Sequence, residues 1–139
     1  MSGTSTRDEM FQAALKTRDR AHVPYSGFKV GACLRCDDGR LYTACNVENI
    51  AYPQSQCAEA SAIGVMVASG AKRILEALVV ADDEGLCTPC GGCRQRLSEF
   101  ADKDTVIHIA GLEGVRASFT MAELLPHAFE FTFEDKSDG

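Results

Sequence analysis

The stretch RILEALVVAD, residues 73–82, decides the fold class because it is an almost unbroken run of apolar residues. Such a run suits a β-strand that is covered on both faces, which in turn implies a sheet sandwiched between helices. We therefore expect residues 74–81 to form a strand in the middle of the sheet.

Helical and strand patterns lie on both sides of this run. Before it, the sequence predicts a helix over 6–21 that opens with a Thr6–Glu9 capping box, a hairpin with strands 25–36 and 40–47, and a helix from 57 to a stop at Gly70. After it come a helix over 89–101, strands over 105–111 and 115–119, and a short helix that Thr120 and Glu123 cap and Pro126 ends.

This order of elements indicates an α/β fold with three layers, in which helices cover both faces of a mixed sheet of about five strands. No repeat or internal linker interrupts the pattern. We expect a single domain over residues 1–139, with loose tails at 1–5 and 134–139.

The composition is that of a soluble globular protein. Of the 139 residues, 45% are hydrophobic and 24% are charged, which excludes the disordered and fibrous classes. The net charge is −6 and the 14 basic residues are scattered, so nucleic acid is a poor candidate partner. No signal-peptide pattern and no run of 18 apolar residues occurs, so neither export nor membrane spanning is expected. Seven cysteines, an odd number, then indicate thiols or metal ligands in the cytoplasm.

Two of these cysteines open the helix predicted from PCGGCRQRL, residues 89–97. Helical spacing places Cys90 and Cys93 on the inward face with Leu97 and Phe100. The first turn of a helix carries unpaired N–H groups and a partial positive charge, which favour thiolates and hence a metal site. Taken alone, a C-x-x-C pair is equally compatible with two cysteines packed in the core.

A third cysteine strengthens the metal interpretation. Cys57 stands at the start of the preceding helix, so three thiols can meet at two helix N-termini, and a tetrahedral metal would keep one open position. Open zinc sites activate water for hydrolysis and need a proton carrier, for which Glu59 is the candidate. A solvated glutamate at a helix start is the alternative. Because helical positions i and i+2 face nearly opposite ways, Cys57 and Glu59 can act together only if Cys57 lies at the irregular helix cap.

The remaining candidate ligands have weaker patterns. Cys87, with the two cysteines that follow at intervals of three, mimics the first part of a ferredoxin run, but position 97 is leucine where that run needs another cysteine. Cys33 and Cys36 should lie on opposite faces of a strand as core or surface thiols. No histidine has a partner at ligand spacing, so local hydrogen-bonding or surface roles are expected for all three: His22, His108 and His127.

Together these motifs resemble the small zinc-dependent cytidine deaminases, which are usually homotetramers. The wider zinc deaminase signature is a ligand-x-Glu followed by Pro-Cys-x-x-Cys, and here it reads Cys57-Ala58-Glu59 and Pro89-Cys90-Gly91-Gly92-Cys93. The likeness extends from YSGFKVGA through CNVENIAYP and CRQ to LLPHAF. It implies a cytidine-deaminase-like fold and one Zn²⁺ per chain, held by Cys57, Cys90 and Cys93.

The resemblance also implies substrate-binding residues. Phe28 would stack on the pyrimidine ring, Asn46 and Glu48 would hold the ribose hydroxyls, and Ala58 joins this set. Tyr52 and Phe129 are similar to residues that the family lends across subunit boundaries. Without the surrounding motifs, each aromatic residue could be ordinary core and each polar residue an ordinary loop group.

One position departs from the family. Many members have arginine after the Cys-Ala-Glu triplet, where it offsets the thiolate charge, whereas this chain has Ala60; Arg94 is the candidate substitute. The expected reaction is hydrolytic deamination of cytidine and deoxycytidine, as in pyrimidine salvage, with Glu59 as proton carrier. The alternatives are a deaminase of another aminopyrimidine nucleoside, such as a blasticidin-like one, and a non-catalytic structural metal module.

Overall fold

A computed structural model describes residues 3–129 of the chain, with side chains from residue 6 onward. In chain order the elements are α1 (Gly3–Arg18), β1 (Val30–Cys36), β2 (Leu41–Cys45), the 3-10 turn η1 (Tyr52–Gln54), α2 (Ala58–Ala68), β3 (Ile74–Ala81), α3 (Gly91–Phe100), β4 (Ala101–Gly111), β5 (Gly114–Thr120) and α4 (Met121–Leu124).

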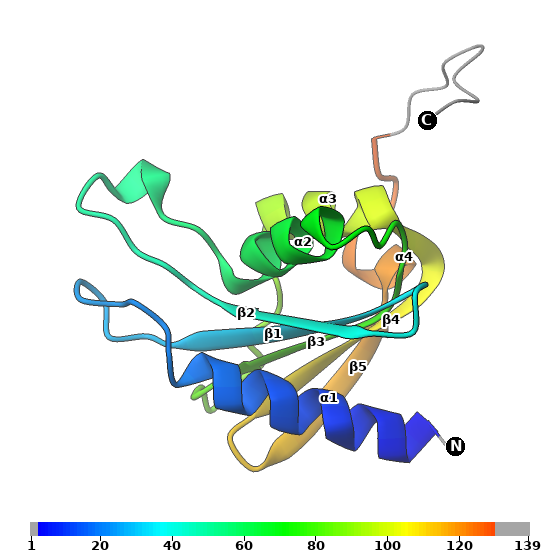
Figure 1. Ribbon diagram of the computed structural model, residues 1–139, viewed down its shortest axis with the longest axis horizontal. Coiled ribbons are helices and arrows are strands. Elements are labelled where there is room, and N and C mark those ends of the chain that lie inside the picture. Colours follow the sequence, from blue (N-terminus) through cyan, green and yellow to red (C-terminus); the bar gives the residue numbers. More distant parts are fainter. Residues whose placement is uncertain (1–2, 130–139) are drawn as a thin grey trace.

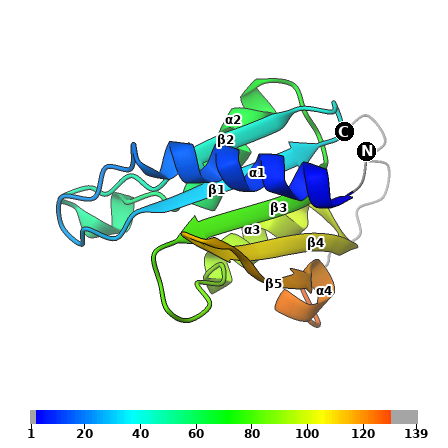
Figure 2. The same cartoon turned by 90° about the horizontal axis from the view of Figure 1, so that it is seen from below.

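The strands form one mixed sheet in the order β2-β1-β3-β4-β5. Only the β3–β4 pair is parallel, and the other three pairs are antiparallel. Helix α1 covers one face and α2, α3 and α4 cover the other (Figure 1), and α1 lies in front of β1 and β2 when the molecule is seen from below (Figure 2). The three-layer α/β/α fold and the central position of the 74–81 strand are thereby confirmed.

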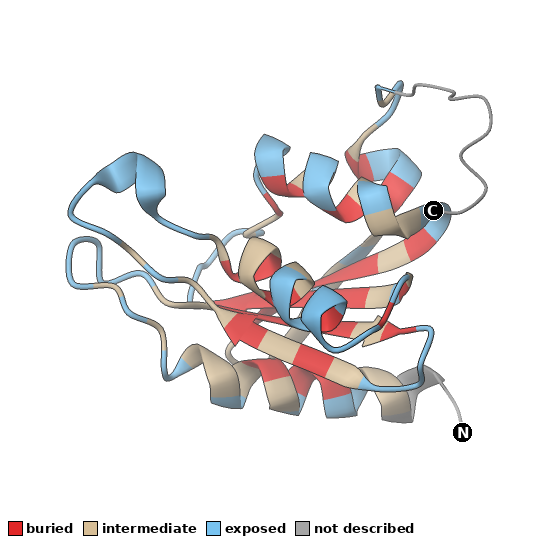
Figure 3. Cartoon of the chain, turned by 45° about the horizontal axis from the view of Figure 1, so that its top comes forward, coloured by how far each residue is buried: buried red, intermediate tan, exposed pale blue. Residues whose placement is uncertain are grey.

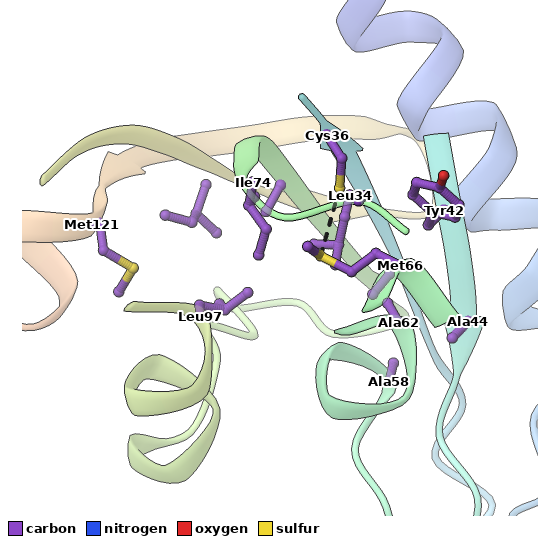
Figure 4. Packing of buried hydrophobic residues seen from close by; sticks show 14 of the residues in the cluster. Leu34, Cys36, Tyr42, Ala44, Ala58, Ala62, Met66, Ile74, Leu97 and Met121 are labelled. Atoms are coloured by element: carbon purple, nitrogen blue, oxygen red, sulfur yellow. Dashed lines mark hydrogen bonds between the residues drawn. The ribbon is translucent and has the colours of Figure 1, made fainter. Parts of the chain in front are cut away.

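The sheet separates two hydrophobic layers. The larger joins α2, α3 and α4 to the sheet and includes Ala62, Met66, Leu97 and Met121 (Figure 4). The smaller lies under α1 and includes Met10, Ala14, Leu78 and Val80. Figure 3 shows the matching burial, with the inward faces of the helices buried and the outward faces exposed.

Cys33 and Cys36 fall into different layers, as their odd spacing predicts. Cys33 packs under α1, whereas Cys36 packs on the α2 side, where its Sγ lies 3.6 Å from Sδ of Met66 (Figure 4). Both side chains are buried, so both are core thiols. The close approach of α1 requires Gly31, because a Cβ there would collide with the carbonyl oxygen of Ala14.

Several predicted boundaries were wrong. Helix α1 begins at Gly3, so residues 3–5 are helical and the expected capping box lies inside the helix. The first hairpin strand begins at Val30 instead of 25, since Gly27 has a φ of +71° and turns the chain. Strand β4 begins at Ala101, ahead of the expected 105. Its first residues are mostly exposed and polar, so they carry no strand pattern.

The capping of α4 by Thr120 and Glu123 is confirmed. The expected tail at 134–139 lies outside the described residues. Within residues 3–129, no helix is both long enough and apolar enough to span a bilayer.

Two loops position the candidate site. Residues 22–29 and 46–57 project together from one end of the sheet (Figures 1 and 3). The rings of Tyr25 and Tyr52 meet edge to face across them, with centroids 5.6 Å apart. Val47 and Gln56 exchange backbone hydrogen bonds of 2.9 and 2.8 Å, which ties the second loop together immediately before Cys57.

Candidate metal centre and active site

Three cysteines meet where α2 and α3 begin. Cys57 is the N-cap of α2 and Cys90 is the N-cap of α3, and both have extended backbones, with ψ of 156° and 169°. Cys93 lies in the first turn of α3. The three sulfur atoms all lie within 4.8 Å of one another. Because Cys57 is the cap residue, it escapes the helical geometry that would point it away from the side chain at position 59.

The donor set fits zinc. Zn–S bonds of about 2.3 Å in a tetrahedron hold sulfurs about 3.8 Å apart, so a small contraction of the cluster suffices. Within residues 3–129, the cluster contains three ligating side chains. A tetrahedral ion held by these three would therefore retain an open position, which is the arrangement of catalytic and not structural zinc sites.

The three thiols differ in acidity. Hydrogen bonding from the backbone N–H of Cys93 lowers the pKa of Cys90, as expected for a thiolate at a helix N-terminus. Burial raises the pKa of Cys93 and of Cys57. Cys90 is also exposed, whereas the sequence placed it on the inward face. Loading of a cation must therefore displace protons from the more buried thiols.

Glu59 lies in the first turn of α2 and is buried, with 6% of its surface exposed. Burial raises its pKa above the ordinary value, and Arg96 opposes that shift. Its charge in turn raises the pKa of Cys93 and Cys57, which places the carboxyl beside the sulfur cluster. A buried carboxyl with a raised pKa is better suited to accept and deliver a proton than a solvated helix-start glutamate.

Glu48 connects the two projecting loops. Its Oε1 accepts hydrogen bonds from the backbone N–H groups of Tyr25 and Ser26 at 3.0 and 3.1 Å, and its Oε2 accepts one from the hydroxyl of Ser26. These bonds hold the pKa of Glu48 below its usual value, with the Ser26 hydroxyl as the largest cause. The carboxylate is thus ionised and fixed in place.

Asn46 fixes the base of the same loops. Its Oδ1 accepts from the backbone N–H of Val30 at 2.9 Å, and its Nδ2 donates to the backbone oxygen of Phe28 at 2.9 Å. Val47 follows Asn46, Gln56 precedes Cys57, and the two pair through their backbones. The loops therefore lie next to the start of α2. Phe28 is 38% exposed, so its ring is available for stacking.

The other expected substrate residues are not all brought together in one chain. Tyr52 is 68% exposed and lines a cavity of about 360 Å³ with Tyr25, Ser26, Glu48 and Ser55. Phe129 is exposed and lines a different cavity, of about 610 Å³, against α4. The side chain of Ala58 is buried in the core, so only its backbone can face a substrate (Figure 4).

Comparison with known proteins agrees with this geometry. The sequence model of the family described as "Cytidine and deoxycytidylate deaminase zinc-binding region" matches residues 4–109, which include all three cysteines and Glu59. The chain belongs to this deaminase family. Zinc is therefore the cofactor of the centre, and its donor set fits that ion.

Curated relatives and solved structures extend the match over most of the chain. A protein named cytidine deaminase from Sporosarcina psychrophila is 41% identical over 88% of this chain and 90% of its own length. Another from Halalkalibacterium halodurans is 38% identical over 95% of this chain and 98% of its own. A crystal structure of cytidine deaminase from Burkholderia pseudomallei is 34% identical and has a TM-score of 0.82, covering 93% of this chain and 100% of that one.

Arg94, the candidate substitute for the arginine that Ala60 replaces, directs its guanidinium to oxygen acceptors and not to the sulfur cluster. Its guanidinium donates Nε to the oxygen of Pro89 at 2.7 Å, Nη1 to the oxygen of Leu124 at 2.9 Å and Nη2 to Oγ1 of Thr88 at 3.0 Å. Arg94 therefore ties the segment before α3 to the end of α4. Instead, Arg96 approaches the sulfur cluster, and its position three residues after Cys93 is the signal that sequence reasoning missed.

The remaining cysteine and histidine candidates lie outside the metal cluster. Cys87 is half-buried and does not belong to the three-sulfur group. His22 and His127 are exposed, as expected. His108 is buried, and its ring joins Glu76 to Ser118 across three strands, with Nδ1 2.7 Å from Oγ of Ser118. A local hydrogen-bonding role thus holds for His108.

Proposed function

We propose that this chain is a zinc-dependent hydrolase that converts cytidine and deoxycytidine to uridine and deoxyuridine and releases ammonia. One observation carries the proposal: three thiols within 4.8 Å of one another stand beside a buried glutamate at two helix N-termini. Membership in the deaminase family and the names of the relatives support the same reaction. A place in pyrimidine salvage would follow from it.

Cys57, Cys90 and Cys93 would hold one zinc ion per chain. Zinc bound there supplies a Lewis acid that activates water for attack at C4 of the pyrimidine. Glu59 would accept one proton from the attacking water and deliver it to N3 of the ring. It would then carry the second proton of that water, taken from the new C4 hydroxyl, to the amino group, which leaves as ammonia. One water is consumed, and the C4–N bond is exchanged for a C4–O bond. The burial of Glu59 supports this role because it keeps the carboxyl's pKa closer to neutral.

The projecting loops would hold the nucleoside. Phe28 stacks on the pyrimidine, Asn46 and Glu48 bind the ribose hydroxyls, and the backbone of Ala58 contacts the ring. The fixed, ionised carboxylate of Glu48 supports a preference for nucleosides over nucleotides, since a 5′-phosphate would enter an already negative pocket.

We further propose a single-domain subunit that assembles as a homotetramer with shared active sites. Ile50, Tyr52 and Phe129 are 80%, 68% and 75% exposed, so their surfaces are accessible to a neighbouring subunit. Tyr52 and Phe129 line separate cavities in one chain. In an assembly, the Phe129 of a neighbouring subunit could reach the cavity that Tyr52 lines. Seven free cysteines support a cytoplasmic location.

Light scattering tests the assembly. We expect a species of four chains of 15.0 kDa each. A fully active monomer would contradict the sharing of active sites, because the lent aromatic residues would have no donor.

The function is tested by incubating zinc-loaded protein with cytidine and following the loss of its ultraviolet absorbance. Deoxycytidine, cytidine 5′-phosphate and a blasticidin-type nucleoside serve as parallel substrates. We expect turnover of cytidine and deoxycytidine and poor turnover of cytidine 5′-phosphate. Zinc-loaded protein that deaminates none of them would favour a structural metal module, and one that acts only on the antibiotic would favour the other aminopyrimidine activity.

A further inference from the structure

Arg96 lies over the sulfur cluster. Its Nη1 is 3.8 Å from Sγ of Cys93, one helical turn earlier on α3. The guanidinium lies against Gly92, where a Cβ would stand 3.4 Å from the same nitrogen. The side chain thus folds back along α3 toward its N-terminus, where the ligands are, while remaining exposed to solvent.

The loaded cluster and the carboxylate of Glu59 together bring more negative charge than the two nearby helix N-termini offset. Three thiolates bring −3 against the +2 of zinc, which leaves −1 at the loaded centre. The N-termini of α2 and α3 offset this by roughly half a charge each. The carboxyl of Glu59 adds negative charge when ionised, and Ala60 contributes none. Arg94 keeps its positive charge but directs its donors to the backbone oxygens of Pro89 and Leu124, whereas Arg96 approaches a sulfur.

We infer that Arg96 is the charge-balancing residue of the metal centre: it stabilises the zinc-loaded, thiolate form through Cys93. The inference rests on the proposed zinc role of the three cysteines. Arg96 is a positioning residue, because it contacts a ligand and not the substrate. A cation there favours the loaded state, which carries net negative charge, over the metal-free state with protonated thiols.

The test compares zinc affinity in three variants by competition with a chelator at fixed pH and ionic strength. Arg96→Gln should bind zinc about tenfold more weakly than the wild type, at the lower end of the loss typical for partners of metal ligands because Arg96 is exposed. Arg96→Lys keeps the charge and should restore most of the affinity. Lys72→Gln makes the same charge change on an exposed residue beyond the far end of α2 and should bind zinc as the wild type does.

A spectroscopic measurement adds a readout that a packing role would not move. Cobalt-loaded Arg96→Gln should show a shifted thiolate-to-cobalt charge-transfer band, whereas cobalt-loaded Lys72→Gln should not. Circular dichroism verifies that each variant is folded.

Unchanged zinc affinity in Arg96→Gln, or equal losses in Arg96→Gln and Arg96→Lys, would overturn the inference. If the wild type binds one zinc and deaminates cytidine while Arg96→Gln binds zinc equally well, only the role of Arg96 is refuted. If the wild type binds no zinc, the proposed function is refuted as well.

Discussion

The helices on the α2 side of the sheet begin in two different ways. Helix α4 opens with a complete capping box, in which Oγ1 of Thr120 accepts from the backbone N–H of Glu123 at 3.2 Å and the Glu123 carboxylate accepts from the backbone N–H of Thr120 at 2.8 Å. Helices α2 and α3 open with cysteines instead, so no side-chain oxygen of the N-cap residue caps either of them.

The N-terminus of α4 is thus stabilised by its own side chains, whereas the N-termini of α2 and α3 are arranged to be stabilised by a bound metal ion. Cysteine lacks the oxygen that makes serine, threonine, aspartate or asparagine a good cap, so α2 and α3 forgo some of that stabilisation. The N–H groups of their first turns instead create the environment in which thiolates and zinc are favourable. Changes at α2 and α3 should therefore alter function or metal binding, and changes at α4 only stability.

The largest effect is expected at the start of α2. Glu59→Gln keeps the side-chain volume but cannot accept or deliver the proton, and a positioned acid/base contributes about 10²–10⁴-fold. Because one residue serves several transfers, kcat should fall by about 10⁴-fold or more while zinc content and fold persist. Steady-state kinetics on zinc-loaded protein checks this, and a variant with more than about a tenth of wild-type turnover would contradict the role.

The next largest effect is the loss of zinc on replacing a cysteine at a helix N-cap, compared with a nearby cysteine outside the cluster. Cys90→Ser removes an expected ligand and should abolish tight zinc binding. Cys87→Ser changes a thiol outside the cluster and should retain one zinc per chain. Elemental analysis of both purified variants decides the matter, and an equal loss of zinc from Cys87→Ser would show that the ligands are wrongly assigned.

Removal of zinc should weaken the two cysteine-capped starts. A ligand present at about a thousand times its dissociation constant stabilises the fold by about 4 kcal/mol, so chelation should lower the free energy of unfolding by that order. Thermal unfolding with and without chelator measures the loss. Amide exchange should rise at the first turns of α2 and α3 and stay unchanged at α4; uniform exchange across all three would remove the distinction.

The smallest effect is expected at α4. Thr120→Ala deletes the capping oxygen and should cost about 1 kcal/mol of stability, as N-cap substitutions do. Zinc content and kcat should match the wild type, because α4 contributes no ligand. Denaturant unfolding beside an activity assay tests this, and a variant of normal stability but low activity would reverse the assignment of the two kinds of helix start.

The sequence was sufficient for the features that depend on burial and spacing. The apolar run identified β3 with its true bounds because a central strand is covered on both faces. The cysteine spacing placed Cys57 and Cys90 at helix starts, and the structure places both at N-caps. The start of β4 was missed because Asp102 to Asp104 are polar and exposed. There, the strand is set by pairing of Ala101 with Ile74, which no local pattern records.

Side-chain contacts between distant segments could not be predicted. The hydrogen bonds of Arg94 to Pro89, Thr88 and Leu124 were not foreseen, since Leu124 lies 30 residues away in the chain. Nor did it indicate that Ser26 holds Glu48, because the two loops meet only in the folded chain. Such contacts depend on where the loops leave the sheet.

The most direct test of the zinc-dependent deamination is a titration of metal-free protein with zinc while cytidine turnover is followed. Activity should be absent without metal, rise in proportion to added zinc, and level off at one zinc per chain, with Cys90→Ser inactive throughout. Full cytidine turnover by the metal-free protein, or none at one bound zinc per chain, would contradict the assignment of Cys57, Cys90 and Cys93 as the catalytic zinc centre.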